Sequence, residues 1–209
     1  MHKLALIFTL LIAACSPAKE SSMAPNYDSL RIVLEGMVSE EQKVRKMLMD
    51  SGGFNSPGAG PIIAKMMEID ERNQAQLNLI LEKYGWIGSS KIGEEAAGAF
   101  FFIIQHSNEE MMSKWFPTLD SLSKLGEANP RYAAMMEDRL LMWQGKKQIY
   151  GTQASDFRSD KQMAIWPIEN PGGVNERRTK IGFSSTVEEY AASMGVIYDP
   201  NDTLPAERD

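Results

Sequence analysis

The sequence predicts a mainly α fold of five to seven helices, packed as an irregular bundle with one late β-hairpin. Apolar residues recur at helical spacing over most of the chain, and glycines, prolines and capping residues separate the periodic segments. After Gly145 this periodicity gives way to an alternating pattern that is typical of strands. The 209 residues suffice for one domain with a substantial core, which we expect to span residues 27–198 before a tail over 199–209.

The N-terminus has the organisation of a secretion signal. The stretch "MHKLALIFTLLIAAC" joins a short basic start to an apolar run that is too short to span a bilayer. Its last four residues resemble the lipobox of bacterial lipoproteins, in which cleavage precedes the cysteine and the sulfur receives a diacylglycerol. Cys15 is the only cysteine, so no disulfide competes for it. We therefore expect a signal peptide over residues 1–14 and lipid attachment at Cys15.

The lipobox resemblance also implies a location. A lipidated Cys15 would anchor the chain in a membrane of the cell envelope, and the polar residues 15–26 would form a flexible tether. Ser16 behind the cysteine favours the outer membrane, at its periplasmic face or at the cell surface, if the cell is Gram-negative. The alternative is an ordinary signal peptide with an incidental cysteine.

Capping patterns divide the first helical region into two helices. Ser29 can cap a short helix, and "SEEQ" from Ser39 is a capping box for a second helix that runs to about Asp50. The next stretch, "SGGFNSPGAGP", holds four glycines and two prolines and predicts a loop. Its last residue, Pro61, suits the first turn of the helix that follows.

The helix expected over residues 61–84 has two polar residues in or beside its apolar stripe. Asn73 lies within the stripe and Asp70 at its edge. A polar side chain in an apolar stripe needs hydrogen-bond partners, because an unpaired one costs stability. The two residues therefore either fix the register between helices or reach into a cleft.

A nearly all-apolar segment predicts the central helix. Residues 92–103 carry alanine, isoleucine and phenylalanine on all sides, as buried helices do. Gln105 and His106 stand at its end, and His106 is the only histidine that remains after signal removal. His106 is either a satisfied residue at a helix end or, because imidazole titrates near neutral pH, a general base.

Two further helices are expected before the β-hairpin. A capping box that starts at Ser107 opens one of them, with Pro117 as a kink or break. Asn129 opens the other, which Gly145 ends. This second helix carries Asp138 and Arg139, which form either a surface ion pair or a pair in which the arginine holds a carboxylate or phosphate.

The segment "QIYGTQ" is the first strand of the expected hairpin, and "KQMAIWPI" is the second. On a strand, Gln148, Tyr150 and Thr152 would share one face, with Gln153 on the other. Gly151 would let a ligand or a helix approach the backbone closely. After the hairpin, we expect Asn175 to cap a short turn that includes Arg177 and Arg178. A last helix is expected to begin with a capping box of Ser185 and Glu188 and to end at Gly195.

Three segments, "QHS", "EDRLLMWQGKKQIYGTQ" and "PIENPGGVNERRTKIGFSSTVEEY", resemble a family of bacterial proteins of unknown function. The resemblance covers roughly residues 70–190 and brings no activity with it. It implies that one set of polar positions recurs and converges, either as a site or as one buried polar network. The matching positions are Asp70, Arg72, Gln105, His106, Asp138, Arg139, Gln148, Tyr150, Gly151, Thr152, Gln153, Arg177 and Arg178.

Composition excludes several functions. The formal net charge is −6 and no basic stripe is present, which disfavours a nucleic-acid partner. One histidine and one lipidated cysteine cannot build a His/Cys zinc site, and the sequence has no nucleophile elbow or phosphate-binding glycine loop. We therefore expect no metal and no cofactor.

Three functions remain open. A binding module for an envelope peptide, glycan or protein partner would use the hairpin face and the arginines. A hydrolase of a cell-wall or periplasmic substrate would use His106 with Asp138, or alternatively with Asp70, as catalytic acid and base. A structural lipoprotein would use the same polar residues only to hold its elements together. The binding residues predicted under the first hypothesis are Asp70, Gln105, Arg139, Gln148, Tyr150, Thr152, Gln153, Arg177 and Arg178.

Overall fold

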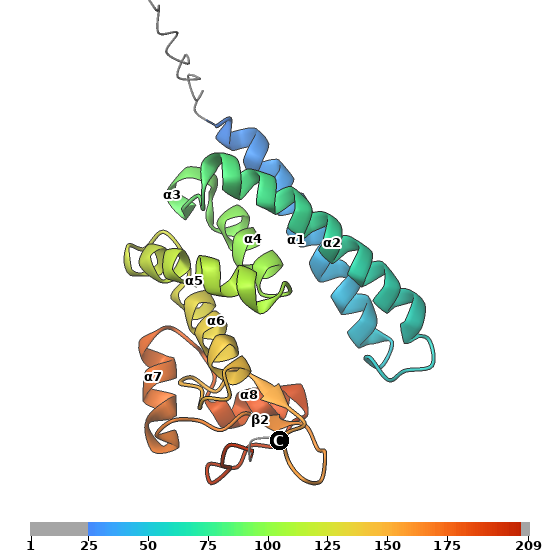
Figure 1. The fold of residues 1–209 in the computed structure, drawn as a ribbon, viewed down its shortest axis with the longest axis vertical. Coiled ribbons are helices and arrows are strands. Elements are labelled where there is room, and N and C mark those ends of the chain that lie inside the picture. Colours follow the sequence, from blue (N-terminus) through green and yellow to red (C-terminus); the bar gives the residue numbers. More distant parts are fainter. Residues whose placement is uncertain (1–24, 206–209) are drawn as a thin grey trace, which may run out of the picture.

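The computed structural model describes residues 25–205, so the predicted signal peptide and the predicted lipid attachment at Cys15 lie outside the described residues. The described chain confirms a mainly helical fold with a small antiparallel hairpin late in the sequence (Figure 1). None of the helices in residues 25–205 has the length and apolar character to cross a membrane. The elements are α1 (Tyr27–Asp50), α2 (Ala59–Tyr84), α3 (Ser89–Ile92), α4 (Glu94–Ile104), α5 (Glu109–Lys124), α6 (Pro130–Trp143), β1 (Ala154–Ser155), β2 (Ala164–Ile165), the 3-10 turn η1 (Pro171–Gly173), α7 (Val174–Lys180) and α8 (Val187–Met194).

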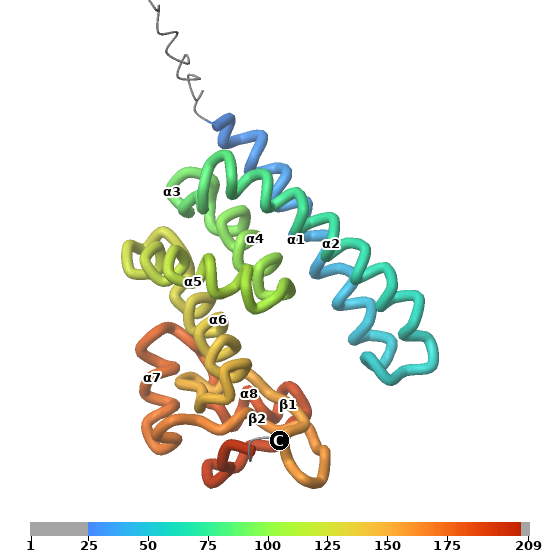
Figure 2. Tube along the Cα trace, viewed as in Figure 1, coloured from blue at the N-terminus to red at the C-terminus, as the bar shows by residue number. Residues whose placement is uncertain are grey.

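The first helix is continuous, so the predicted division at Ser39 is wrong. α1 runs from residue 27 to 50 and lies beside α2 along its whole length (Figure 2). Its buried positions, such as Leu34, Val38 and Leu48, recur at helical spacing through the proposed break. This packing against α2 and α4 keeps the helix intact, because burial of an apolar stripe outweighs a local capping pattern.

α4 forms the centre of the larger core, as its sequence predicts. Phe100 and Phe101 are fully buried, and the helix packs against α1 and α2 on one side and α5 on another. α5 continues through Pro117 to Lys124, so no break occurs there. α6 then leads from this helical core to the C-terminal part of the molecule (Figure 1).

Helix ends follow the expected chemistry with small shifts. Asn129 caps α6 by accepting a hydrogen bond from the Arg131 N–H at 3.0 Å. α5 is capped by Asn108 rather than by Ser107. The last capping box starts at Thr186, one residue later than predicted. Consecutive polar residues precede both helices, and the sequence alone does not distinguish which of them becomes the cap.

The C-terminal part has a small core of its own. Ile165, Ile168, Val174, Val187 and Ala191 form it, and we call it the second core. β1 and β2 pair over only two residues each. The segment over residues 148–153 is not a strand, so the predicted division of its side chains between two strand faces is wrong. Gly151 turns the chain there with a φ of +70°.

Candidate functional site

Asp138 on α6 holds the segment over residues 148–153, which we call the 148–153 loop. Its carboxylate is fully buried and accepts hydrogen bonds from the backbone N–H groups of Ile149 at 2.7 Å, Tyr150 at 3.1 Å and Thr152 at 3.0 Å. The Thr152 hydroxyl donates a fourth at 2.9 Å. Burial raises the pKa of Asp138, while these donors act in the opposite direction. Asp138 is therefore surrounded by donors of its own chain.

Gln148 and Gln153 close the loop on itself. The buried Gln148 amide donates to the carbonyls of Gln153 at 3.0 Å and Trp166 at 2.6 Å, and its oxygen accepts from the Gln153 N–H at 2.9 Å. The Gln148 backbone also pairs with residues 167 and 169. These bonds occupy the polar groups that a ligand would have to use.

Arg177 and Arg178 of α7 bind the loop from the other side. Arg177 Nε donates to the Ile149 carbonyl at 3.0 Å, and Arg178 Nη1 donates to the Tyr150 carbonyl at 2.9 Å. Arg178 is only 1% exposed and its guanidinium also donates to Ser185. Burial lowers the pKa of Arg178, and Asp138 acts in the opposite direction. The two arginines thus complete the loop's hydrogen bonding.

Gly151 explains why the loop approaches the second core so closely. A Cβ at this position would lie 2.7 Å from both Ile168 Cδ1 and Val187 Cγ2. The neighbour that approaches the Gly151 backbone is therefore the second core. The loop positions converge as the family resemblance implies, and they do so as a buried polar network.

A second group of charged side chains lies where the C-terminal end of α4 meets α1 and α2. We call it the Glu41–His106 cluster; it consists of Glu41, Arg45, Asp70, His106 and Arg139. Glu41 Oε1 lies 3.3 Å from His106 Nε2 and 2.7 Å from Arg45 Nε. Arg45 Nη2 donates to both Asp70 oxygens, at 2.9 and 3.1 Å. The Glu41 side chain is 1% exposed and that of His106 is 27% exposed, so solvent reaches the cluster through the imidazole.

The environment keeps the His106 imidazole neutral. Burial, followed by the guanidinium groups of Arg45 and Arg139, lowers the pKa of His106 to about 3. Burial also raises the pKa of Glu41, against the effect of Arg45. Glu41 Oε1 and Arg45 Nη1 are buried without a hydrogen-bond partner, although Glu41 Oε1 lies in ion-pair contact with Arg45 Nε. Buried polar atoms of this kind are typical of functional sites.

Arg139 connects the two groups. Its Nε donates to Gln153 Oε1 at 2.8 Å, and its Nη1 donates to the Gln105 carbonyl at 2.5 Å. Burial lowers the pKa of Arg139, and Arg45 acts in the same direction. Between residues 25 and 205, Arg139 forms no salt bridge with a carboxylate. The 148–153 loop therefore positions an uncompensated guanidinium beside His106.

The predicted site residues thus separate into two neighbouring sets. Asp138, Gln148, Tyr150, Thr152, Gln153, Arg177 and Arg178 build the 148–153 loop, whereas Asp70, Gln105, His106 and Arg139 contribute to the cluster. Arg72 pairs with Glu40 on the surface instead. Asn73 donates to the Met37 carbonyl at 3.1 Å and so links α2 to α1.

Sequence reasoning missed Glu41 and Arg45. A signal was present, because Glu41 lies among the buried apolar residues of α1 at helical spacing from Val38 and Val44. The same observation singled out Asn73 in α2. The capping-box interpretation of "SEEQ" concealed it, since that interpretation places Glu41 in an exposed first turn.

Comparison with known proteins supplies a family and no activity. No curated protein and no solved structure matches the chain. The model of a family of unknown function, DUF6624, matches residues 28–199, which include every element from α1 to α8 except the first residue of α1. The chain therefore belongs to DUF6624, a family of unknown function.

Proposed function

We propose that this protein is a lipid-anchored binding protein of the cell envelope, and that the Glu41–His106 cluster holds the carboxylate or phosphate group of its ligand. The observation that carries the proposal is Arg139, a largely buried guanidinium without a carboxylate partner among the described residues. Buried charges in proteins are normally paired, because desolvation of an unpaired charge costs several kcal/mol. An anionic ligand would supply the missing partner.

The charge balance of the cluster supports an anion. Arg45 already has Glu41 and Asp70 as its partners. Neither of these carboxylates forms a salt bridge with Arg139, so its guanidinium has no anionic partner within the cluster. Arg139 is held by two acceptors from different elements, so its remaining N–H groups have a fixed direction, as bidentate recognition of carboxylate or phosphate requires.

The proposal predicts a measurable change at His106. An anion bound beside Arg139 should raise the pKa of His106 above its value of about 3, because it offsets the two guanidinium charges. In the mature protein His106 is the only histidine, so NMR titration of imidazole signals reports on it alone. Titrations with inorganic phosphate and with acetate would distinguish the two anion types.

Variants locate the effect. Arg139→Gln should abolish the anion-induced change at His106, and Arg139→Lys should keep part of it, because a lysine retains the charge without the guanidinium geometry. Arg131→Gln, an exposed substitution on the same helix, should leave it intact. The proposal would be wrong if neither anion moved the His106 titration, or if Arg139→Gln left the response unchanged.

The lipid anchor has its own test. Mass spectrometry of the mature N-terminus should find a diacylglycerol thioether on Cys15 and no residues before it. An unmodified Cys15, or cleavage at another position, would refute the anchor without affecting the proposal for the cluster.

One observation favours a second candidate function, acid–base hydrolysis of a cell-wall or periplasmic substrate. Glu41 and His106 lie 3.3 Å apart, close enough for a proton to pass between carboxyl group and imidazole. Burial raises the pKa of Glu41, as suits an acid, whereas the pKa of about 3 of His106 requires that a bound anionic substrate first raise it, by offsetting the guanidinium charges of Arg45 and Arg139. In this proposal Glu41 is the acidic partner of His106, since Asp138 is committed to the 148–153 loop.

The hydrolase proposal is tested by incubating the protein with purified peptidoglycan and measuring released fragments by mass spectrometry. Glu41→Gln and His106→Gln should each abolish release. Glu40→Gln, which changes the exposed neighbour of Glu41, should not. Absence of release by the unmodified protein, or equal release by all variants, would exclude this activity on peptidoglycan.

A further inference from the structure

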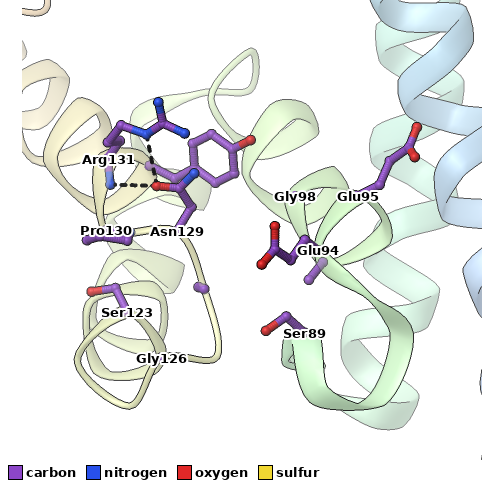
Figure 3. Close-up of a pocket in the computed structure, with 12 residues that line it drawn as sticks. Ser89, Glu94, Glu95, Gly98, Ser123, Gly126, Asn129, Pro130 and Arg131 are labelled. Carbon is purple, nitrogen blue, oxygen red and sulfur yellow. Dashed lines mark hydrogen bonds between the residues drawn. The ribbon is translucent and has the colours of Figure 1, made fainter. Parts of the chain in front are cut away.

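An open cavity lies at the end of α4 opposite to His106. It has a volume of about 690 Å³, which falls within the range of small-molecule sites, and separates α3 and the start of α4 from the α5–α6 connection (Figure 3). Its lining is mixed, with charged, hydroxyl, amide and aromatic groups. The lining residues that matter below are Ser89, Glu94, Gly98, Asn129, Arg131 and Tyr132.

Packing fixes the walls of this cavity. The Tyr132 ring stacks on Phe101, with centroids 4.4 Å apart and an interplanar angle of 5°. A Cβ at Gly98 would come within 3.4 Å of the Tyr132 ring, so glycine leaves the ring room beside α4. On the opposite wall, the Glu127 carbonyl and carboxylate accept hydrogen bonds from the N–H groups of Ser89 and Ser90 at 2.9 and 3.0 Å. The cavity is therefore preformed, which reduces the entropic cost of binding.

Opposite charges share the cavity without pairing. Glu94 projects from α4 towards Asn129 and Pro130 (Figure 3). Burial has the largest effect on the pKa of Tyr132 and raises it, Arg131 lowers it, and the Glu94 carboxylate raises it. Arg131 Nε donates to Asn129 Oδ1 at 3.2 Å, which fixes the base of its guanidinium. Neither Glu94 nor Arg131 forms a salt bridge within the described part of the chain. Each charge is thus available to a ligand.

We propose that this cavity binds a zwitterionic ligand, a short peptide with free ends, with its ammonium group at Glu94 and its carboxylate at Arg131. Charges of opposite sign on opposite sides of one cavity can recognise a molecule that carries both. A polyanion is disfavoured, because the carboxylate of Glu94 lies in the same lining as Arg131. The peptide backbone would lie along Gly98 and Tyr132. This site is separate from the Glu41–His106 cluster and does not depend on the function proposed for it.

Trialanine tests the inference by isothermal titration calorimetry with the purified protein. N-acetylation of trialanine removes its ammonium charge, and amidation of its C-terminus removes its carboxylate. Each change should weaken binding by about tenfold or more, the usual effect of losing a charge-assisted hydrogen bond. The substitutions Glu94→Gln and Arg131→Gln should weaken binding of unmodified trialanine to a similar extent.

Combining variant and ligand gives the decisive measurement. N-acetylation should have no further effect in Glu94→Gln, and amidation none in Arg131→Gln, because each variant has already lost the corresponding contact. Glu95→Gln is the matched control, since the Glu95 side chain points away from the cavity (Figure 3). Circular dichroism would confirm that these exposed substitutions leave the fold intact.

Three results would overturn the inference: no binding of trialanine, equal loss in Glu95→Gln and Glu94→Gln, or binding that is lost in Arg139→Gln but kept in Glu94→Gln. The last result would place the peptide in the Glu41–His106 cluster. Retained trialanine binding in Arg139→Gln, together with loss in Glu94→Gln, supports the cavity whether or not the cluster binds an anion.

Discussion

Replacing Asp138 with asparagine should destabilise the protein strongly while changing almost none of its volume. The Asp138 carboxylate is buried and accepts hydrogen bonds from three backbone N–H groups and one hydroxyl. Asparagine offers one carbonyl oxygen and places an NH₂ group where the other oxygen stood. That NH₂ group would face N–H donors, so about half of the donors would lose their acceptor.

The magnitude follows from the number of donors. Hydrogen bonds to a charged acceptor contribute roughly 1.5–3 kcal/mol each, and a buried donor without an acceptor costs about 1–3 kcal/mol. Loss of about two bonds, each taken in the lower half of the second range, predicts a decrease of roughly 2–4 kcal/mol in the free energy of unfolding. Asp138→Ala, which orphans all four donors, should cost more than about 4 kcal/mol, a large part of the roughly 5–15 kcal/mol available to a domain.

Urea unfolding followed by tryptophan fluorescence measures this change. Trp166 is a suitable reporter, because its Nε1 donates to the Lys146 carbonyl beside the loop at 2.7 Å. With a urea dependence of about 2 kcal/mol per molar, Asp138→Asn should lower the midpoint by roughly 1–2 M. Asp156→Asn, an exposed aspartate in a nearby loop, should shift it by less than about 0.3 M. Equal midpoints for the two variants would refute the role assigned to Asp138.

Three further predictions concern the loop and the cluster. Gly151→Ala should lower the free energy of unfolding by about 2 kcal/mol, because φ is +70° and the new Cβ would lie 2.7 Å from side chains of the second core. Thermal denaturation should show a lower melting temperature, and an unchanged one would contradict this prediction. Arg178→Lys should cost about 1–3 kcal/mol in urea unfolding, since lysine cannot reach both carbonyls that the guanidinium holds; a cost within experimental error would contradict this. His106→Gln should reduce acid sensitivity. The pKa of His106 is about 3 in the folded protein, below that of the unfolded chain, so the unfolded chain binds its proton first as the pH drops. The free energy of unfolding should therefore fall between about pH 6.5 and pH 3, by at most about 1.4 kcal/mol per pH unit. Identical pH dependence of stability in wild type and variant would contradict this.

The sequence predicts most of the helices because their signals are local. Asn129 and Gly145 mark the two ends of α6: Asn129 is its N-cap, and Gly145 follows the C-cap Gln144 with a φ of +67°. α4 is recognised as the central helix because it is apolar on nearly all sides. The division of α1 at Ser39 fails for the opposite reason. A capping pattern is a local preference, whereas the continuity of α1 depends on its packing against α2 and α4.

The roles of the polar residues depend on burial, which the sequence does not reveal. The family resemblance identifies the positions around "YGTQ" but leaves open whether they line a site or build a network. The structure places Gln148, Thr152 and Gln153 under the surface, where they bond to their own chain. The proximity of Glu41 and His106 could not be predicted, because α1 and the end of α4 are far apart in the sequence and meet only through tertiary packing.

The 148–153 loop also determines how this protein can be shortened. Three of its backbone N–H groups are bound by Asp138 of α6, but the carbonyls of Ile149 and Tyr150 are bound by α7, which follows later in the chain. A chain that ends after β2 contains Asp138 but lacks Arg177 and Arg178, which bind the carbonyls of the loop. A protease cut or stop codon after β2 should therefore yield an insoluble fragment rather than a smaller stable domain. The described residues after β2, 166–205, therefore complete both the loop and the second core, and the helices before them do not form a stable smaller domain.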